Sequence, residues 1–156
     1  MFFLKPKVKL SFIIKSKKWE NKIPNLKKLS DKVITKTFKK IKHPIKKGME
    51  VNVMLTGDKE IQMFNKEYRG KNKPTNVLSF ETGDEILLGD IVMSIDTLLK
   101  EAKAQKISVA DHYAHLLCHG MLHLLGFDHI EKDEANEMEF FEIEILKELK
   151  IANPYE

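Results

Sequence analysis

One segment of the chain, His119–His129, reads HGMLHLLGFDH and spaces its three histidines as H-x3-H-x5-H. Residues four apart on an α-helix differ by about 40° in direction, so His119 and His123 project from adjacent turns of one face. Gly126 favours the end of this helix, and the following turn can bring His129 back to the same point. Three neutral imidazoles leave one position of a metal ion open for water, as in catalytic zinc sites. The segment therefore predicts a metal site with these three histidine ligands.

The positions of four nearby residues relative to this motif predict their roles. His115 lies one turn before His119 and is expected either to support the ligands, to face the substrate, or to form a hydrogen bond in the core. His112, a further turn away, is expected on the surface. Asp128 can orient an imidazole or cap the next turn. Cys118 lies about 100° around the helix from His119, which predicts a small buried core residue.

Hydrophobic periodicity predicts the elements around the metal helix. Strands are predicted over residues 8–14, 51–55, 77–80 and 89–95, and helices over about 25–41, 58–68, 96–102, 108–125 and 133–149. Asp58 and Asp96 are expected to cap their helices, and Ser108 with Asp111 to form a start that resembles a capping box. The prediction is one α+β domain over residues 1–156, with a small mixed four-stranded sheet and about five helices. The order of the strands stays open.

Length and composition narrow the class of protein. The 156 residues are 42% hydrophobic and 32% charged, which suits one domain with its own core. A single cysteine excludes an internal disulfide and suits a reducing cytosol. The apolar runs are shorter than a membrane span, and Met1–Leu4 are followed by lysines rather than by the long apolar stretch of a secretion signal. We therefore expect a cytoplasmic protein without a membrane partner.

Charge is distributed unevenly along the chain, although the net charge is only +4. Residues 1–50 contain 16 lysines and 3 acidic residues, whereas residues 51–156 contain 11 basic and 20 acidic residues. Such separation predicts a basic surface for a polyanion such as nucleic acid, or for a membrane surface. The alternative is a solvated lysine surface, because all the basic residues except one are lysine.

Two single residues bear on the chemistry of the metal site. Metzincin proteases share the histidine spacing, but a glutamate follows their first histidine and acts as the general base. Gly120 stands at that position here and cannot accept a proton, so the segment predicts a zincin-like metal helix without the protease base. Arg69 is the only arginine and precedes the polar loop Gly70–Asn76. A guanidinium matches phosphate with a two-pronged contact; the alternative is an exposed charge at a helix end.

Three motifs together resemble the YbeY family of bacterial endoribonucleases. They are His119–His129 including Gly120, Asn65–Arg69 together with Pro74–Phe80, and Leu88–Ser94. The acidic last helix and the sequence near Asn153–Tyr155 also fit the family, so the resemblance spans roughly residues 50–155. One departure is Asn76, where the family usually has aspartate, and this substitution removes a charge beside the loop.

The resemblance implies a metal-dependent enzyme that cleaves single-stranded RNA in small-subunit ribosomal RNA 3′-end maturation and in ribosome quality control. It implies one zinc ion, or another divalent metal, bound by His119, His123 and His129, with Arg69 at the scissile phosphate. It also implies that Asp90 lies near the site or a partner surface; the alternative for Asp90 is a residue of a strand-end turn. The implied partners are the small ribosomal subunit and its RNA, with ribosomal proteins or an assembly GTPase as further candidates.

Several alternatives remain open at this stage. The attacking group is either a metal-activated water or the neighbouring ribose 2′-OH. With an RNA substrate, the lysine-rich portion becomes a docking surface, for which the predicted nucleic-acid-binding residues are Lys27, Lys28, Lys39 and Lys40. The other functions considered are a metallopeptidase-like hydrolase that uses another carboxylate as base, a non-catalytic ribosome-assembly factor with a metal site, and a structural lysine-rich domain.

Overall fold

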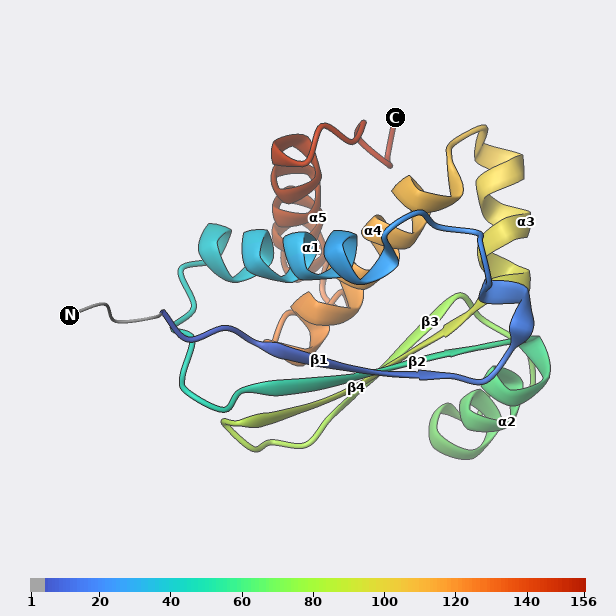
Figure 1. The fold of residues 1–156 in the computed structure, drawn as a ribbon, viewed down its shortest axis with the longest axis horizontal. Coiled ribbons are helices and arrows are strands. Elements are labelled where there is room, and N and C mark those ends of the chain that lie inside the picture. The colour runs from blue at the N-terminus through green and yellow to red at the C-terminus, as the bar shows by residue number, and fades with distance from the viewer. Residues whose placement is uncertain (1–4) are drawn as a thin grey trace.

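A computed structural model of the protein describes residues 5–156. Met1–Leu4, which enter the expectation about a secretion signal, lie outside these residues. The chain forms one mixed sheet with helices on both of its faces (Figure 1). Within the described part of the chain, no helix combines the length and the apolar character that a membrane crossing requires.

The sheet has four strands in the order β1-β2-β4-β3. Strands β1 (Lys9–Ile14), β2 (Glu50–Thr56) and β4 (Leu87–Ser94) are parallel, and β3 (Val77–Glu81) runs antiparallel to β4. The predicted mixed four-stranded sheet is therefore confirmed, and the structure supplies the strand order. The strands β1 and β3 form the two edges of the sheet.

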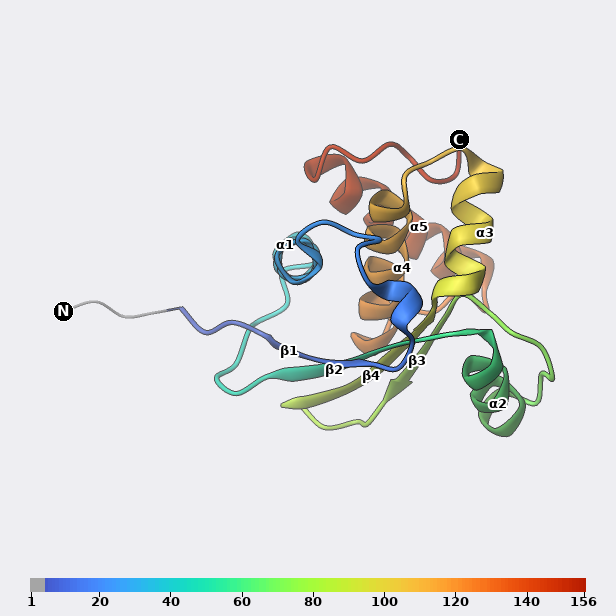
Figure 2. The same ribbon diagram turned by 45° about the vertical axis from the view of Figure 1, so that its right-hand side comes forward.

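Helices cover the two faces of the sheet unequally (Figures 1 and 2). One face is covered by the helices α1 (Leu26–Lys40), α3 (Ile95–Gln105), α4 (Val109–Leu124) and α5 (Lys132–Glu148). On the other face α2 (Asp58–Arg69) covers only one end of the sheet. A short 3₁₀ helix, η1 (Lys17–Trp19), follows β1 on the side of α4, where Trp19 packs edge-on against Tyr113. The number and approximate bounds of the five α-helices match the prediction.

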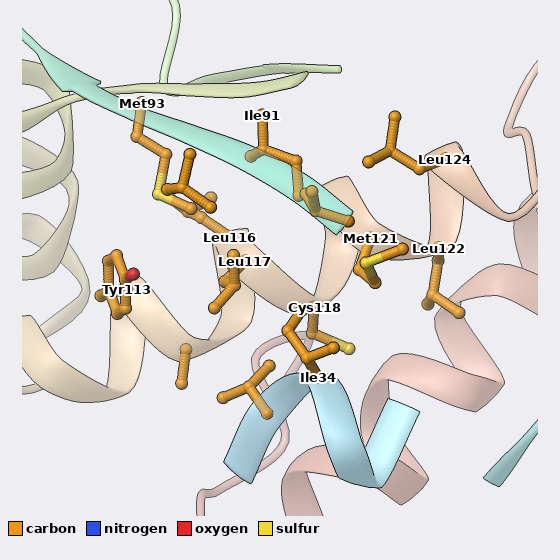
Figure 3. Packing of buried hydrophobic residues seen from close by; sticks show 14 of the residues in the cluster. Ile34, Ile91, Met93, Tyr113, Leu116, Leu117, Cys118, Met121, Leu122 and Leu124 are labelled. Carbon is orange, nitrogen blue, oxygen red and sulfur yellow. The ribbon is translucent and has the colours of Figure 1, made fainter. Parts of the chain in front are cut away.

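The core lies between the sheet and α4, which is buried on nearly all sides (Figure 3). Leu117 and Met121 of α4 are fully buried in the same cluster as Ile91 of β4 and Ile34 of α1. Cys118 is also fully buried, as predicted, and burial raises the pKa of its thiol to about 12. Because α4 is held from both sides, its histidines are fixed relative to the sheet.

Two predicted helix caps are wrong. Ser94, not Asp96, caps α3, because its hydroxyl accepts from the Thr97 N–H at 3.5 Å. The Asp96 carboxylate instead accepts from the backbone N–H of Asp58 at 2.9 Å and from Lys18 at 2.8 Å.

Asp58 is the first residue of α2 rather than its cap, which is Gly57. Its carboxylate accepts from the hydroxyls of Ser94 and Thr97, each at 2.6 Å. The reason for both errors is tertiary: β2 and β4 are adjacent and parallel, so the helices that follow them begin side by side and exchange carboxylates. The predicted cap of α4 is confirmed, since Ser108 accepts from the Asp111 N–H at 3.0 Å.

Candidate metal centre and active-site cavity

The three predicted metal ligands meet at one point. His119 and His123 occupy successive turns of α4, and Gly126, with φ +100°, turns the chain so that His129 returns to them. One ligand nitrogen from each histidine lies within 4.8 Å of the others. The Nε2 atoms of His119 and His123 are 3.1 Å apart, close to the separation of about 3.3 Å that tetrahedral Zn–N bonds of 2.0–2.1 Å produce. The donor set and its spacing fit a zinc ion.

The electrostatics of His123 favour a ligand role. Burial lowers its pKa to about 4, and the neighbouring His119 and His129 contribute to the same shift. A metal can bind only an imidazole nitrogen that carries no proton. His123 is therefore neutral, with a lone pair available, at physiological pH.

Glu142 of α5 lies behind His119 and was not predicted from the sequence. Its carboxylate is fully buried, and Oε1 is 2.5 Å from Nδ1 of His119. Burial alone would raise the pKa of Glu142, but the nearby His115 and hydrogen bonds from His119 and Tyr155 lower it to about 2. Glu142 is thus a buried anion next to a metal ligand.

His115 and His112 both lie on the buried side of α4. His115 Nε2 is 3.6 Å from Glu142 Oε1, which places His115 behind the ligands rather than in the cavity. His112 is 2% exposed, so its predicted surface position is wrong. Its Nε2 lies 2.8 Å from Glu101 of α3, and burial lowers the pKa of His112. The error arose because α3 covers a face of α4 that sequence spacing alone leaves open.

Asn76 contacts Glu101, the same residue that His112 contacts. Its side-chain amide donates to both carboxylate oxygens of Glu101, at 3.1 and 3.3 Å, and its Oδ1 accepts from the Val77 N–H. An amide can donate to a carboxylate, whereas an ionised aspartate in this position would face Glu101 with like charge. Asn76 therefore ties the start of β3 to α3.

Gly120, at the position of the protease glutamate, lies where α4 packs closely on the sheet. A Cβ at this residue would lie 3.0 Å from Ile91 Cγ2 and 3.1 Å from Ser79 Oγ. The Ser79 hydroxyl also donates to the carbonyl of Gly120 at 3.0 Å. Close packing against β3 and β4 thus accounts for glycine at this position.

Arg69, at the end of α2, is held by β3. Its Nη2 donates to the carbonyl of Ser79 at 2.7 Å, and its guanidinium carbon lies 5.1 Å from the centroid of the Phe80 ring. Ser79 therefore contacts Arg69 through its carbonyl and the metal helix through its hydroxyl. The guanidinium is exposed but has a defined position.

A cavity of about 660 Å³ brings Arg69 and the three histidines together. Two cations of the loop after α2, Lys71 and Lys73, also line it and were not singled out from the sequence. The sequence signal that could have identified them is their position: both lie within four residues of Arg69, the predicted phosphate contact. The backbone of this loop is fixed by Asn65, whose amide donates to the Lys73 carbonyl at 2.9 Å. The cavity therefore combines a metal-binding wall with a cationic wall.

The remaining predicted site residues fall in different places. Asp128 lines the cavity and accepts from the His129 N–H at 2.7 Å, which is the turn-capping role. Asp90 is absent from the residues that line this cavity within the described chain; it accepts from the Asn52 amide at 2.9 Å on the face of the sheet that α2 leaves uncovered. Lys27, Lys28, Lys39 and Lys40 lie on α1, and Lys40 is 3.4 Å from Glu148.

An α+β fold with three histidines in a cation-lined cavity defines a class of protein: a metal-site hydrolase with a place for an anionic substrate. Comparison with known proteins identifies the family within this class. Residues 13–150 match the family model described as Endoribonuclease YbeY. The chain belongs to the endoribonuclease YbeY family, and the match extends further toward the N-terminus than the sequence motifs did.

Relatives with the name Endoribonuclease YbeY occur in several bacteria. The protein of Francisella philomiragia is 50% identical over 123 residues, which are 73% of this chain and 77% of that protein. That of Alteromonas mediterranea is 53% identical over 112 residues, or 69% and 71% of the two chains. A solution structure of a Thermotoga maritima protein shares the fold with a TM-score of 0.57 and 24% identity, covering 92% of this chain and 91% of that one.

Proposed function

We propose that the protein is a metal-dependent endoribonuclease that cleaves single-stranded RNA, and that it acts in 3′-end maturation of small-subunit ribosomal RNA and in ribosome quality control in the cytoplasm. The observation that carries the proposal is the single cavity in which His119, His123 and His129 face a wall that contains Arg69, Lys71 and Lys73. The family membership supports RNA as the substrate. The small ribosomal subunit, its ribosomal RNA and its assembly proteins are the proposed partners.

Different residues of this chain have different roles in the proposed phosphodiester cleavage. His119, His123 and His129 hold the metal, for which we propose zinc; when bound, it polarises the phosphate and activates water. Arg69 contacts the scissile phosphate with its guanidinium, which the Ser79 carbonyl and Phe80 ring position in advance. Lys71 and Lys73 neutralise adjacent phosphates. Gly120 provides no general base, which separates this site from that of a metzincin protease.

The lysines of residues 1–50 supply a second contact with RNA in this proposal. Lys27, Lys28 and Lys39 are exposed on α1. Lys28 also lines a groove of about 1110 Å³ between α1 and β1, together with further lysines that are Lys7, Lys9, Lys32, Lys36 and Lys150. The groove adjoins β1, whereas the metal cavity adjoins β3, so the two lie at opposite edges of the sheet. We propose that the groove holds backbone phosphates at a distance from the scissile bond.

The proposal is tested by metal analysis and RNA cleavage with wild type, His123→Ala and Arg69→Ala. Wild type is expected to bind one metal ion per chain and to cut single-stranded but not double-stranded RNA. His123→Ala should lose both the metal and cleavage. Arg69→Ala should keep the metal and lose about 10²–10³-fold in kcat, as expected when one donor to the developing charge is removed. Lys66→Ala, an exposed cation of the same helix, is the control.

Three outcomes would contradict parts of this proposal. Metal-loaded wild type that leaves RNA intact in a contaminant-free preparation would indicate an assembly factor without catalysis. Full activity of metal-loaded Arg69→Ala would remove the phosphate contact from the proposal. A cyclic phosphate on the product would identify the ribose 2′-OH, and not water, as the attacking group.

A further inference from the structure

Glu142 joins the metal helix to the segment that follows α5. Its fully buried carboxylate meets His119 Nδ1 at 2.5 Å and His115 Nε2 at 3.6 Å through Oε1. Its other oxygen, Oε2, accepts from the hydroxyl of Tyr155. Two other parts of the chain, α4 and the segment with Tyr155, therefore converge on this one buried anion.

The contact with Glu142 selects which nitrogen of His119 is free to bind a metal. A neutral imidazole carries its proton on one nitrogen and a lone pair on the other. The carboxylate of Glu142 can only accept a hydrogen bond, so the contact requires the His119 proton on Nδ1 and leaves the lone pair on Nε2. Nε2 is also the atom that lies 3.1 Å from Nε2 of His123, on the side of the three-histidine cluster.

We propose that Glu142 and Tyr155 are positioning residues that hold His119 in the tautomer and orientation required for metal binding. The inference rests on the metal site of the proposed function, which it deepens by assigning the groups behind one ligand. Carboxylates that orient a ligating histidine raise the basicity of the ligand, and their loss typically weakens metal binding 10–100-fold. Neither residue lines the cavity itself. Glu142 therefore acts through His119, and Tyr155 acts through Glu142.

Tyr155 is needed because a buried carboxylate with one free oxygen is costly. Its hydroxyl satisfies Oε2, and this second contact fixes the plane of the carboxylate so that Oε1 faces His119. The ring of Tyr155 packs edge-on against His115, with centroids 5.7 Å apart. The backbone N–H of Tyr155 donates to Asn153 Oδ1 at 2.8 Å, which turns the chain back toward α5.

The decisive variant is Glu142→Gln, which keeps the shape and an acceptor oxygen but removes the charge. We expect its zinc affinity, measured by competition with a chromophoric chelator, to fall 10–100-fold. In the zinc-free protein, ¹⁵N NMR of the His119 ring should show the Nδ1–H tautomer in wild type and a mixture in the variant. Glu144→Gln, on the same helix and half-buried, is the matched control and should behave as wild type.

Tyr155→Phe removes one hydroxyl and is expected to weaken zinc binding several-fold with the same direction of tautomer change. Circular dichroism shows whether each variant folds. If Glu142→Gln does not fold, Tyr155→Phe is the deciding variant. Zinc affinity and His119 tautomer unchanged in the deciding variant would overturn the inference. Wild type that binds zinc but does not cleave RNA would overturn the proposed function and leave this inference standing.

Discussion

Gly120 is the residue at which this site departs most clearly from a zinc protease. The absence of a glutamate there was evident from the sequence, but its reason was not. The reason is packing, because the position of a Cβ at Gly120 is already crowded by Ile91 and Ser79. The same close approach allows the Ser79 hydroxyl to reach the Gly120 carbonyl and so links the metal helix to the strand that holds Arg69.

Introducing the protease residue at this position should therefore damage the fold rather than create a peptidase. We expect Gly120→Glu to lower the free energy of unfolding by about 1–3 kcal/mol, because overpacking displaces neighbouring side chains. Urea unfolding of the zinc-free protein measures this change. Gly120→Ala, which adds only the Cβ, should have a smaller effect. Wild-type stability in Gly120→Glu would show that the sheet has room at this position.

At the scale of elements, α4 was predicted well because its signals are local. Ser108 begins the helix through its own side chain, and Gly126 ends it through a backbone conformation that suits glycine. The starts of α2 and α3 were predicted less well, because Asp58 and Asp96 bind across to the neighbouring helix. A carboxylate near a helix start carries no information about which amide or hydroxyl of another element it will meet.

The contact between α3 and α4 has a consequence for pH dependence. Burial lowers the pKa of His112 in the fold, and the charged or titratable groups that face it are Glu101 and His115. The unfolded chain therefore binds a proton near pH 6.5 that the folded chain resists. Above about pH 6.5 His112 is neutral in both states and does not change the free energy of unfolding. As the pH falls below about 6.5, the free energy of unfolding should decrease by at most about 1.4 kcal/mol per pH unit.

The change is measured as the difference between wild type and His112→Gln in urea unfolding of the zinc-free protein from pH 7.5 to 5. Wild type should lose more stability than the variant over this range. His43→Gln, at the end of α1, controls for the loss of one histidine. Parallel pH curves for wild type and His112→Gln would show that this histidine does not contribute.

At the scale of the whole molecule, the lysine-rich groove and the metal cavity are separated in space. The groove of lysines adjoins β1, and the metal cavity adjoins β3 at the other edge of the sheet. The structure also changes which lysines are the best candidates for RNA binding. Lys28, Lys32 and Lys36 line the groove together, whereas Lys40 is engaged with Glu148.

Charge reversal in the groove should weaken RNA binding without affecting the metal site. We expect Lys28→Glu/Lys32→Glu to bind a labelled single-stranded RNA at least several-fold more weakly, measured by fluorescence anisotropy in chelator. The slope of log K against log salt should become shallower by about 1.4, since each phosphate contact on single strands contributes about 0.7.

The matched control is Lys100→Glu/Lys103→Glu, which makes the same charge change on exposed residues of α3. Equal effects of the two pairs would indicate that only net charge matters. No effect in either pair would return the groove lysines to a role as solvated surface residues.

The sequence by itself determined the features that depend on neighbours along the chain. These are the helices and strands, the face shared by His119 and His123, and the return of His129 after Gly126. The contrast between the lysine-rich first 50 residues and the acidic remainder is also evident from the sequence. Helix periodicity, caps and turns operate within a few residues, so they can be inferred from spacing. Only the tertiary structure decided the strand order, the burial of His112 and the partners of Glu142. Glu142 is 23 residues from His119 in sequence, and which buried groups meet over such separations depends on how the helices pack.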